Sequence, residues 1–151
     1  MPGWRYFDTS YLVPLVMEEA TSVPLLAYMS QLDENTFATS HWTRTELSSL
    51  LGVRVRSKLL TSEEARRAER GFGEFLASFE LFPVSSRDFE SASAMLREHD
   101  LGLRAGDALH LAIAQNSGAS QLLSLDKKLL RAGRRFGTDA TTGVALGGYD
   151  S

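Results

Sequence analysis

Short apolar runs alternate with longer segments of helical period along this chain of 151 residues, and this alternation is the strongest constraint on its fold. The runs predicted as strands are residues 4–7, 36–40, 80–84, 121–125 and, from a weaker pattern, 135–137. Strands that alternate with helices typically form a parallel sheet covered by helices. The sequence therefore predicts an α/β fold with a central parallel sheet of about five strands. Its length suits a single domain over residues 1–151.

The segments between these runs carry helix signals. Residues 9–17 are predicted to be helical provided that Pro14 lies in the first turn, because a proline further along removes a backbone hydrogen bond. A helix is expected over residues 42–60, and Ser86 is expected to cap another. Residues 108–114 are apolar nearly all round, which predicts a buried helix. About residues 138–151 form a tail rich in Gly and Thr that no pattern assigns to an element.

Acidic residues stand where a parallel sheet would gather a ligand. Asp8 and Asp126 follow predicted strands, and ligands bind beyond the carboxyl ends of such strands. Asp8, Asp126 and Asp107 each precede a predicted helix, so each alone is more simply explained as an N-cap. Glu46 is no cap; it lies about 40° from Leu50 on a helical wheel, at the margin of the apolar face. Together the four acids are better explained by a shared cleft.

Four carboxylates in one cleft would repel one another unless a cation neutralised them. Ligation by oxygen alone favours Mg²⁺ or Mn²⁺. Such an ion can activate a water molecule and stabilise charge on a phosphodiester. His110 lies three residues after Asp107 and could reach the same ion. We expect it instead to pack or hydrogen-bond beside the cleft, because oxygen sites for Mg²⁺ rarely recruit imidazole.

Four short motifs resemble, in chain order, the acidic motifs of PIN-domain nucleases. They are Phe-Asp-Thr-Ser at residues 7–10, Thr-Glu-Leu at 45–47, Gly-Asp-Ala-Leu-His-Leu-Ala at 106–112 and Leu-Ser-Leu-Asp at 123–126. The resemblance runs from about residue 5 to 136, and the size of the chain is most similar to the VapC toxins of prokaryotic toxin–antitoxin pairs.

The resemblance implies a PIN-like fold and a metal-dependent endoribonuclease that hydrolyses RNA phosphodiester bonds. It implies that Asp8, Glu46 and Asp107 hold the metal and that Asp126 completes the catalytic cluster. Ser10 would orient a carboxylate or a water molecule, and Ser124 would keep the hydroxyl that the family usually places two residues before its fourth acid. The implied partners are tRNA or another structured RNA, a VapB-like antitoxin that covers the cleft, and a second copy in a homodimer.

The net charge of the chain and its local distribution lead to different expectations about nucleic-acid binding. The net charge is −3, from 16 Lys and Arg against 19 Asp and Glu, which argues against a nucleic-acid binder. However, residues 127–135 are strongly basic and contain no acid. Lys127, Lys128 and Arg131 in this run could hold RNA phosphates or could form a solvated helix face.

Two other functions remain open on the sequence. A PIN scaffold could bind RNA or a partner without cutting, although a degenerate site would normally have lost one acid. An aspartyl-phosphate phosphatase would use Asp8 as nucleophile, but Ser10 stands where a second Asp is wanted. A cytoplasmic protein is expected, since no signal peptide, no membrane-spanning apolar run and no cysteine is visible.

Overall fold

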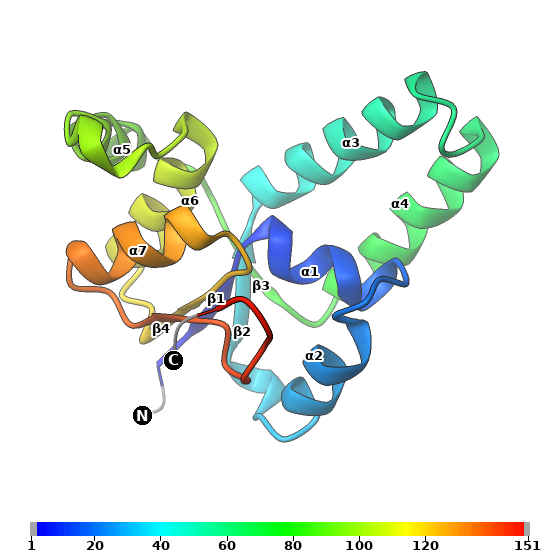
Figure 1. The fold of residues 1–151 in the computed structure, drawn as a ribbon, viewed down its shortest axis with the longest axis horizontal. Coiled ribbons are helices and arrows are strands. Elements are labelled where there is room, and N and C mark those ends of the chain that lie inside the picture. The colour runs from blue at the N-terminus through cyan, green and yellow to red at the C-terminus, as the bar shows by residue number, and fades with distance from the viewer. Residues whose placement is uncertain (1–2, 150–151) are drawn as a thin grey trace.

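The computed structural model describes residues 3–149, and within them the chain forms a five-stranded sheet with every strand parallel (Figure 1). The strands are β1 (Arg5–Phe7), β2 (Phe37–Ser40), β3 (Glu80–Phe82), β4 (Gln121–Leu123) and β5 (Ala140–Thr141). Their order across the sheet is β3-β2-β1-β4-β5. The predicted α/β class and parallel sheet are confirmed. Residues 1, 2, 150 and 151 of the predicted domain and tail lie outside the described residues.

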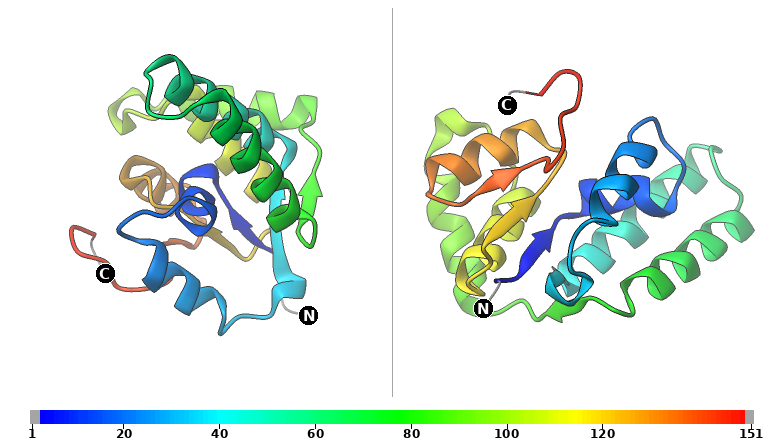
Figure 2. Two further views of the ribbon diagram at one scale, coloured as in Figure 1. Left: turned by 90° about the vertical axis from the view of Figure 1, so that its right-hand side faces the viewer. Right: turned by 90° about the horizontal axis from the view of Figure 1, so that it is seen from below.

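Helices cover both faces of this sheet (Figures 1 and 2). On one face lie α1 (Thr9–Val16), α2 (Ser22–Met29), α3 (His41–Arg56) and α4 (Ser62–Leu76). On the other lie α5 (Ser86–Leu96), α6 (Ala105–Asn116) and α7 (Lys127–Arg135). Two single 3₁₀ turns, Glu34–Thr36 and His99–Leu101, complete the connections. No helix among residues 3–149 is both long and apolar enough to cross a membrane.

Alternate residues of the central strands supply the two cores. Tyr6 and Leu122 point toward α5–α7, whereas Phe7 and Leu123 point toward α1–α4, and all four side chains are fully buried. Successive side chains of a strand point to opposite faces, so a strand buried on both faces is apolar throughout. This is why short unbroken apolar runs correctly marked β1 and β4.

The predicted strand at residues 135–137 is wrong. Helix α7 continues to Arg135, and Gly137 follows it with a positive φ of 82°, so these residues end a helix. The last strand is Ala140–Thr141. Gly133 allows α7 to lie directly on this strand, because a Cβ there would stand 2.7 Å from the Cβ of Ala140.

Helix boundaries differ from the predictions at three places. Pro14 is the sixth of the eight residues of α1, not in its first turn, and the helix survives because it is short and capped by Asp8. The cap of α5 is Ser85 rather than Ser86, in a capping box with Asp88. Helix α3 ends at Arg56, before Lys58 takes a positive φ of 61°.

Candidate active site

The sheet has its topological switch point between β1 and β4. From β1 the chain builds β2 and β3 on one side, and β4 and β5 on the other, so the connections after β1 and β4 diverge and leave a crevice. Asp8 directly follows β1, and Asp126 comes three residues after the end of β4. The fold therefore puts both acids at the edge where α/β sheets bind ligands.

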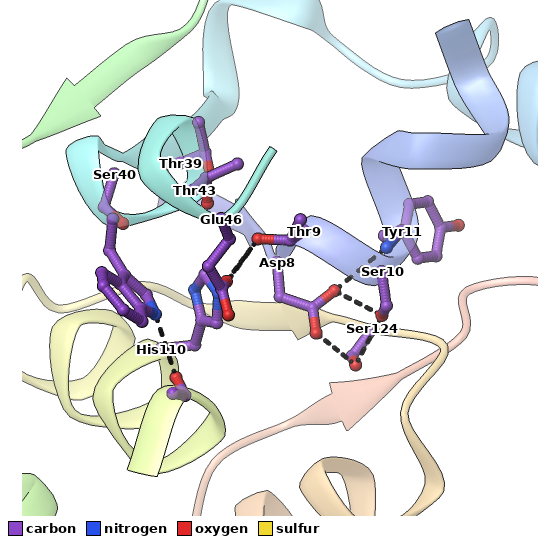
Figure 3. Close-up of polar contacts among 12 residues, drawn as sticks. Asp8, Thr9, Ser10, Tyr11, Thr39, Ser40, Thr43, Glu46, His110 and Ser124 are labelled. Carbon is purple, nitrogen blue, oxygen red and sulfur yellow. Dashed lines mark hydrogen bonds and ion pairs between the residues drawn. The ribbon is translucent and has the colours of Figure 1, made fainter. Parts of the chain in front are cut away.

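Asp8 is a buried carboxylate held by three donors (Figure 3). Ser10 Oγ donates to it at 2.8 Å, Ser124 Oγ at 2.7 Å and the backbone N–H of Tyr11 at 3.1 Å. Burial raises the pKa of Asp8, and it outweighs the opposing effects of His110 and of these donors. Asp8 is thus an N-cap and a cleft residue at once.

The two serines also tie the β4 loop to Asp8. Ser10 Oγ accepts a hydrogen bond from the N–H of Leu125 at 2.9 Å. Ser124 Oγ accepts one from the N–H of Asp126 at 3.0 Å. Each hydroxyl therefore donates to one carboxylate and accepts from the loop that carries the other, which fixes Asp8 and Asp126 relative to each other.

Glu46 is oriented by a polar chain that begins with Tyr6 on β1, and Figure 3 shows the part of it formed by Thr9, Glu46 and His110. His110 Nε2 pairs with Glu46 Oε1, and Thr9 Oγ1 donates to the same oxygen at 2.6 Å. The hydroxyl of Tyr6 contacts His110 Nδ1 at 2.8 Å and Ser40 Oγ at 2.7 Å. Burial by itself would raise the pKa of Glu46, but His110 and Thr9 together lower it. The predicted place of His110 beside the cleft agrees with these contacts.

Asp107 is the third residue of α6, so it does not cap that helix; Arg104 occupies the N-cap position. Gly106 lets the start of α6 approach α3, because a Cβ there would lie 3.0 Å from Glu46 Oε2 and 3.4 Å from Trp42 Cζ2. The pKa of Asp107 is raised to about 7, first by burial and then by the negative charges of Asp126 and Asp8. The negative charges of Asp126 and Asp8 therefore act together on the protonation of Asp107.

Two adjoining clefts collect the four predicted carboxylates. Asp8, Glu46 and Asp107 line a cleft of about 550 Å³. Glu46, Asp107 and Asp126 line a second cleft of about 610 Å³. Glu46 and Asp107 belong to both, so the four side chains border two adjoining clefts.

A family model described as the PIN domain matches residues 5–135. The chain belongs to the PIN domain family. No curated protein matches it.

Solved structures share the fold of this PIN domain at low sequence identity. FitAcB from Neisseria gonorrhoeae is 15% identical with a TM-score of 0.73, over 92% of this chain and 97% of that chain. VapC20 from Mycobacterium tuberculosis, a toxin that cleaves the sarcin-ricin loop, is 20% identical with a TM-score of 0.69, over 85% and 95%. VapBC2 from Rickettsia felis, bound to a DNA fragment from its promoter, is 14% identical with a TM-score of 0.64, over 91% and 96%.

The acidic donors of this PIN domain fit a divalent cation in type but are not a closed ligand cage. Among residues 3–149, no three acidic or imidazole side chains lie close enough together to hold one ion. All four acids nevertheless offer oxygen, and a cation would relieve the repulsion felt by Asp107. Binding would require the side chains to close on the ion.

Two of the three basic residues predicted for RNA line the cleft of this PIN domain. Lys127 and Lys128 stand beside Asp107 and Asp126. Arg131 does not: its guanidinium donates to the carbonyl of Leu101 at 3.0 Å, and it lines a neighbouring pocket. Asp126 caps α7 by accepting from the N–H groups of Lys128 and Leu129, at 2.9 and 3.1 Å.

Sequence reasoning missed several residues at the site. Thr9 was signalled only by its place next to Asp8, and Tyr6 only by a hydroxyl on a buried strand. Trp42, whose Nε1 donates to the carbonyl of Gly106 at 3.3 Å, gave no signal. Arg104 and Tyr149 also line the cleft of about 610 Å³, and both come from segments without a motif.

Proposed function

We propose that this PIN domain is a metal-dependent endoribonuclease that hydrolyses RNA phosphodiester bonds. The observation that carries the proposal is that Asp8, Glu46, Asp107 and Asp126 line two adjoining clefts, one of which Lys127 and Lys128 also line. Carboxylates alone would repel a phosphodiester, whereas carboxylates that hold a cation beside Lys127 and Lys128 would attract one. Mg²⁺ or Mn²⁺ is the cofactor that this donor set favours.

Each side chain then has a role that follows from its contacts. When bound, Mg²⁺ or Mn²⁺ supplies an activated water molecule and stabilises the charge on the phosphate. The four carboxylates hold the ion, with Ser10 and Ser124 orienting Asp8 and with His110 and Thr9 orienting Glu46. Lys127 and Lys128 hold the backbone of the RNA.

We further propose that the nuclease is the toxin of a toxin–antitoxin pair. The support is the fold shared with VapC20 and with VapBC2, together with a toxin–antitoxin complex from Klebsiella pneumoniae at 19% identity and a TM-score of 0.62. The partner would be a VapB-like antitoxin that covers the cleft and brings an Arg or Lys to the carboxylates. The target would be tRNA or another structured RNA, and the protein would act as a cytoplasmic homodimer.

The contacts of Asp8 disfavour the phosphatase alternative. Both oxygens of this carboxylate accept serine hydrogen bonds, and Ser10 itself is bound to the β4 loop. An aspartyl-phosphate phosphatase would want a second carboxylate at the position of Ser10, whose hydroxyl instead donates to Asp8. A non-catalytic PIN scaffold is the second candidate, and it differs from the nuclease only in the outcome of a cleavage assay.

The test compares purified wild type with Asp107→Asn on total tRNA and ribosomal RNA, in Mg²⁺, in Mn²⁺ and in EDTA. Asp100→Asn is the matched control, because Asp100 is an exposed acid that lines neither cleft. We expect cleavage by wild type and Asp100→Asn that EDTA abolishes, and none by Asp107→Asn at an unchanged fold. Undiminished cutting by Asp107→Asn, or by wild type in EDTA, would exclude the proposal. Sequencing of RNA 5′ ends would locate the cut.

The toxin role is tested separately by co-expression with the small reading frame next to the gene. We expect the neighbouring protein to relieve toxicity and to co-purify. Failure of both would exclude the toxin role and leave the nuclease proposal standing.

A further inference from the structure

Tyr149 returns from the end of the described chain to the cleft that holds the acids. It lines the cleft of about 610 Å³ together with Glu46, Asp107 and Asp126. Its hydroxyl donates to the carbonyl of Leu125 at 2.5 Å, in the loop between β4 and Asp126. The ring is therefore anchored at one end while part of its surface faces the cleft.

A lysine of the same cleft stands over one face of this ring. Lys127 Nζ stands 5.2 Å from the centroid of Tyr149, within cation–π range. Tyr149 and Lys127 also line a second pocket, of about 280 Å³, with Arg131 and Arg134. The pair thus forms a ridge between the acidic cleft and a basic pocket.

Among residues 3–149, the adjoining cleft has no such basic wall. The side chains that line the cleft of about 550 Å³ include Asp8, Glu46 and Asp107 but no Lys or Arg. An RNA strand that leaves the carboxylates on the Tyr149 side therefore meets cationic side chains that line the clefts. An aromatic ring next to a row of cations is the composition that binds single-stranded nucleic acid, by stacking on bases and pairing with phosphates.

We propose that Tyr149 stacks on a base next to the scissile phosphate, and that the strand continues over its ring toward Arg131 and Arg134. This rests on the proposed function, since it assigns a substrate contact at the same site. Burial raises the pKa of the Tyr149 hydroxyl, and the charges of Asp126 and Asp8 raise it further. The hydroxyl thus stays protonated as the donor to Leu125, and the ring binds substrate without acid–base chemistry.

The first experiment measures binding of short single-stranded RNA by fluorescence anisotropy, in an Asp107→Asn background that does not cut. Tyr149→Ala should weaken binding by about 5- to 150-fold, the range of one base–aromatic stack. Tyr149→Phe, which keeps the ring, should bind within about twofold of the parent. The control is Phe89→Ala, which removes a ring that is 55% exposed and lines none of the clefts, and it should change nothing.

The second experiment separates stacking from a merely structural role for the ring. One abasic nucleotide is moved along the RNA, and the loss caused by Tyr149→Ala is measured at each position. The loss should disappear at one position, where there is no base left to stack, and persist at the others. An equal loss at every position would overturn the proposal, as would equal effects of the Phe and Ala variants. A loss of antitoxin binding without a loss of RNA binding would also overturn it, by making the ring a protein contact.

These outcomes are independent of the cleavage assay. If wild type fails to cut RNA but the abasic effect is seen in the Asp107→Asn background, the nuclease is excluded and Tyr149 remains a stacking residue. If wild type cuts RNA but no abasic effect is seen in that background, the nuclease stands and the stacking role is excluded.

Discussion

His110 and Glu46 form a pair in which a buried imidazole, 1% exposed, holds a carboxylate that borders both clefts. The imidazole is itself fixed at Nδ1 by the hydroxyl of Tyr6. A side chain that orients a metal ligand typically contributes 10- to 100-fold to affinity or activity. The pair therefore makes His110 a positioning residue for the proposed metal site.

We expect His110→Gln to reduce metal-dependent cleavage by about 10- to 100-fold. It should also shift the acid limb of the pH–rate profile upward, because His110 lowers the pKa of Asp8 and Asp107 as well as that of Glu46, and its loss raises all three. The measurement is the pH dependence of cleavage at saturating Mg²⁺. Tyr6→Phe is the graded control: it removes the two buried hydrogen bonds to Ser40 and His110, costs about 1–3 kcal/mol of stability and should reduce cleavage less. An unshifted acid limb in His110→Gln would count against the positioning role.

Gly106→Ala should separate stability from activity. Alanine favours a helix over glycine by about 1 kcal/mol, but the new Cβ would press on Glu46 Oε2 at 3.0 Å. We expect an unchanged or higher melting temperature together with weaker cleavage. Gly73→Ala in α4 is the matched control, because its Cβ would meet nothing within 4 Å and should stabilise the protein without loss of activity. Full activity in Gly106→Ala would show that Glu46 tolerates displacement.

The raised pKa of Asp107 predicts how metal-free stability depends on pH. The pKa is 3.8 for the ordinary group and about 7 in the fold, so between these values the folded state binds more protons than the unfolded state. The contribution of Asp107 to the stability of the fold is full below about pH 4 and is lost as the pH rises through about 7. In EDTA, the melting temperature of wild type relative to Asp107→Asn should fall from pH 5 to pH 8. A constant difference would mean that Asp107 is not perturbed.

The sequence predicted the sheet and the strand ends that carry Asp8 and Asp126 better than the side-chain contacts that orient the carboxylates. Asp8 and Asp126 could be placed because each follows a buried apolar run, which marks a strand end without any tertiary information. The pairing of His110 with Glu46 depends on how closely α6 approaches α3, and no local pattern encodes that approach. The two-residue strand β5 is too short for any periodicity. Tyr149 follows this strand in a tail without helix or strand, so no pattern pointed to it as a residue that lines the cleft.

The salt dependence of RNA binding should distinguish the lysines from Arg131. Replacement of Lys127 and Lys128 by Gln should reduce the slope of log affinity against log salt by about 0.7 for each lost phosphate contact. Arg131→Gln should reduce the slope only for RNA long enough to reach the neighbouring pocket, because Arg131 lines that pocket and not the cleft of the carboxylates. A slope unchanged by the double lysine variant would assign these residues to a solvated helix face.

Asp126→Asn tests whether the carboxylates act as one group while helix capping is held nearly constant. Asn caps a helix about as well as Asp, so the cap of α7 should persist. Without metal, removal of one negative charge relieves the repulsion that Asp126 exerts on Asp107, so the variant should melt higher than wild type in EDTA. Mg²⁺ should then stabilise wild type by RT ln(1 + [L]/Kd), about 2.7 kcal/mol at a hundredfold excess over Kd.

The variant should lose most of this gain, because one ligand of the ion is missing. The melting curves of wild type and Asp126→Asn should therefore cross as Mg²⁺ is titrated, with the variant higher at first and wild type higher at the end. A mere cap would give two parallel curves, since neither the repulsion nor the ion would depend on Asp126. Parallel curves would remove Asp126 from the proposed metal site, and the same titration on Asp107→Asn would then decide whether any shared site exists.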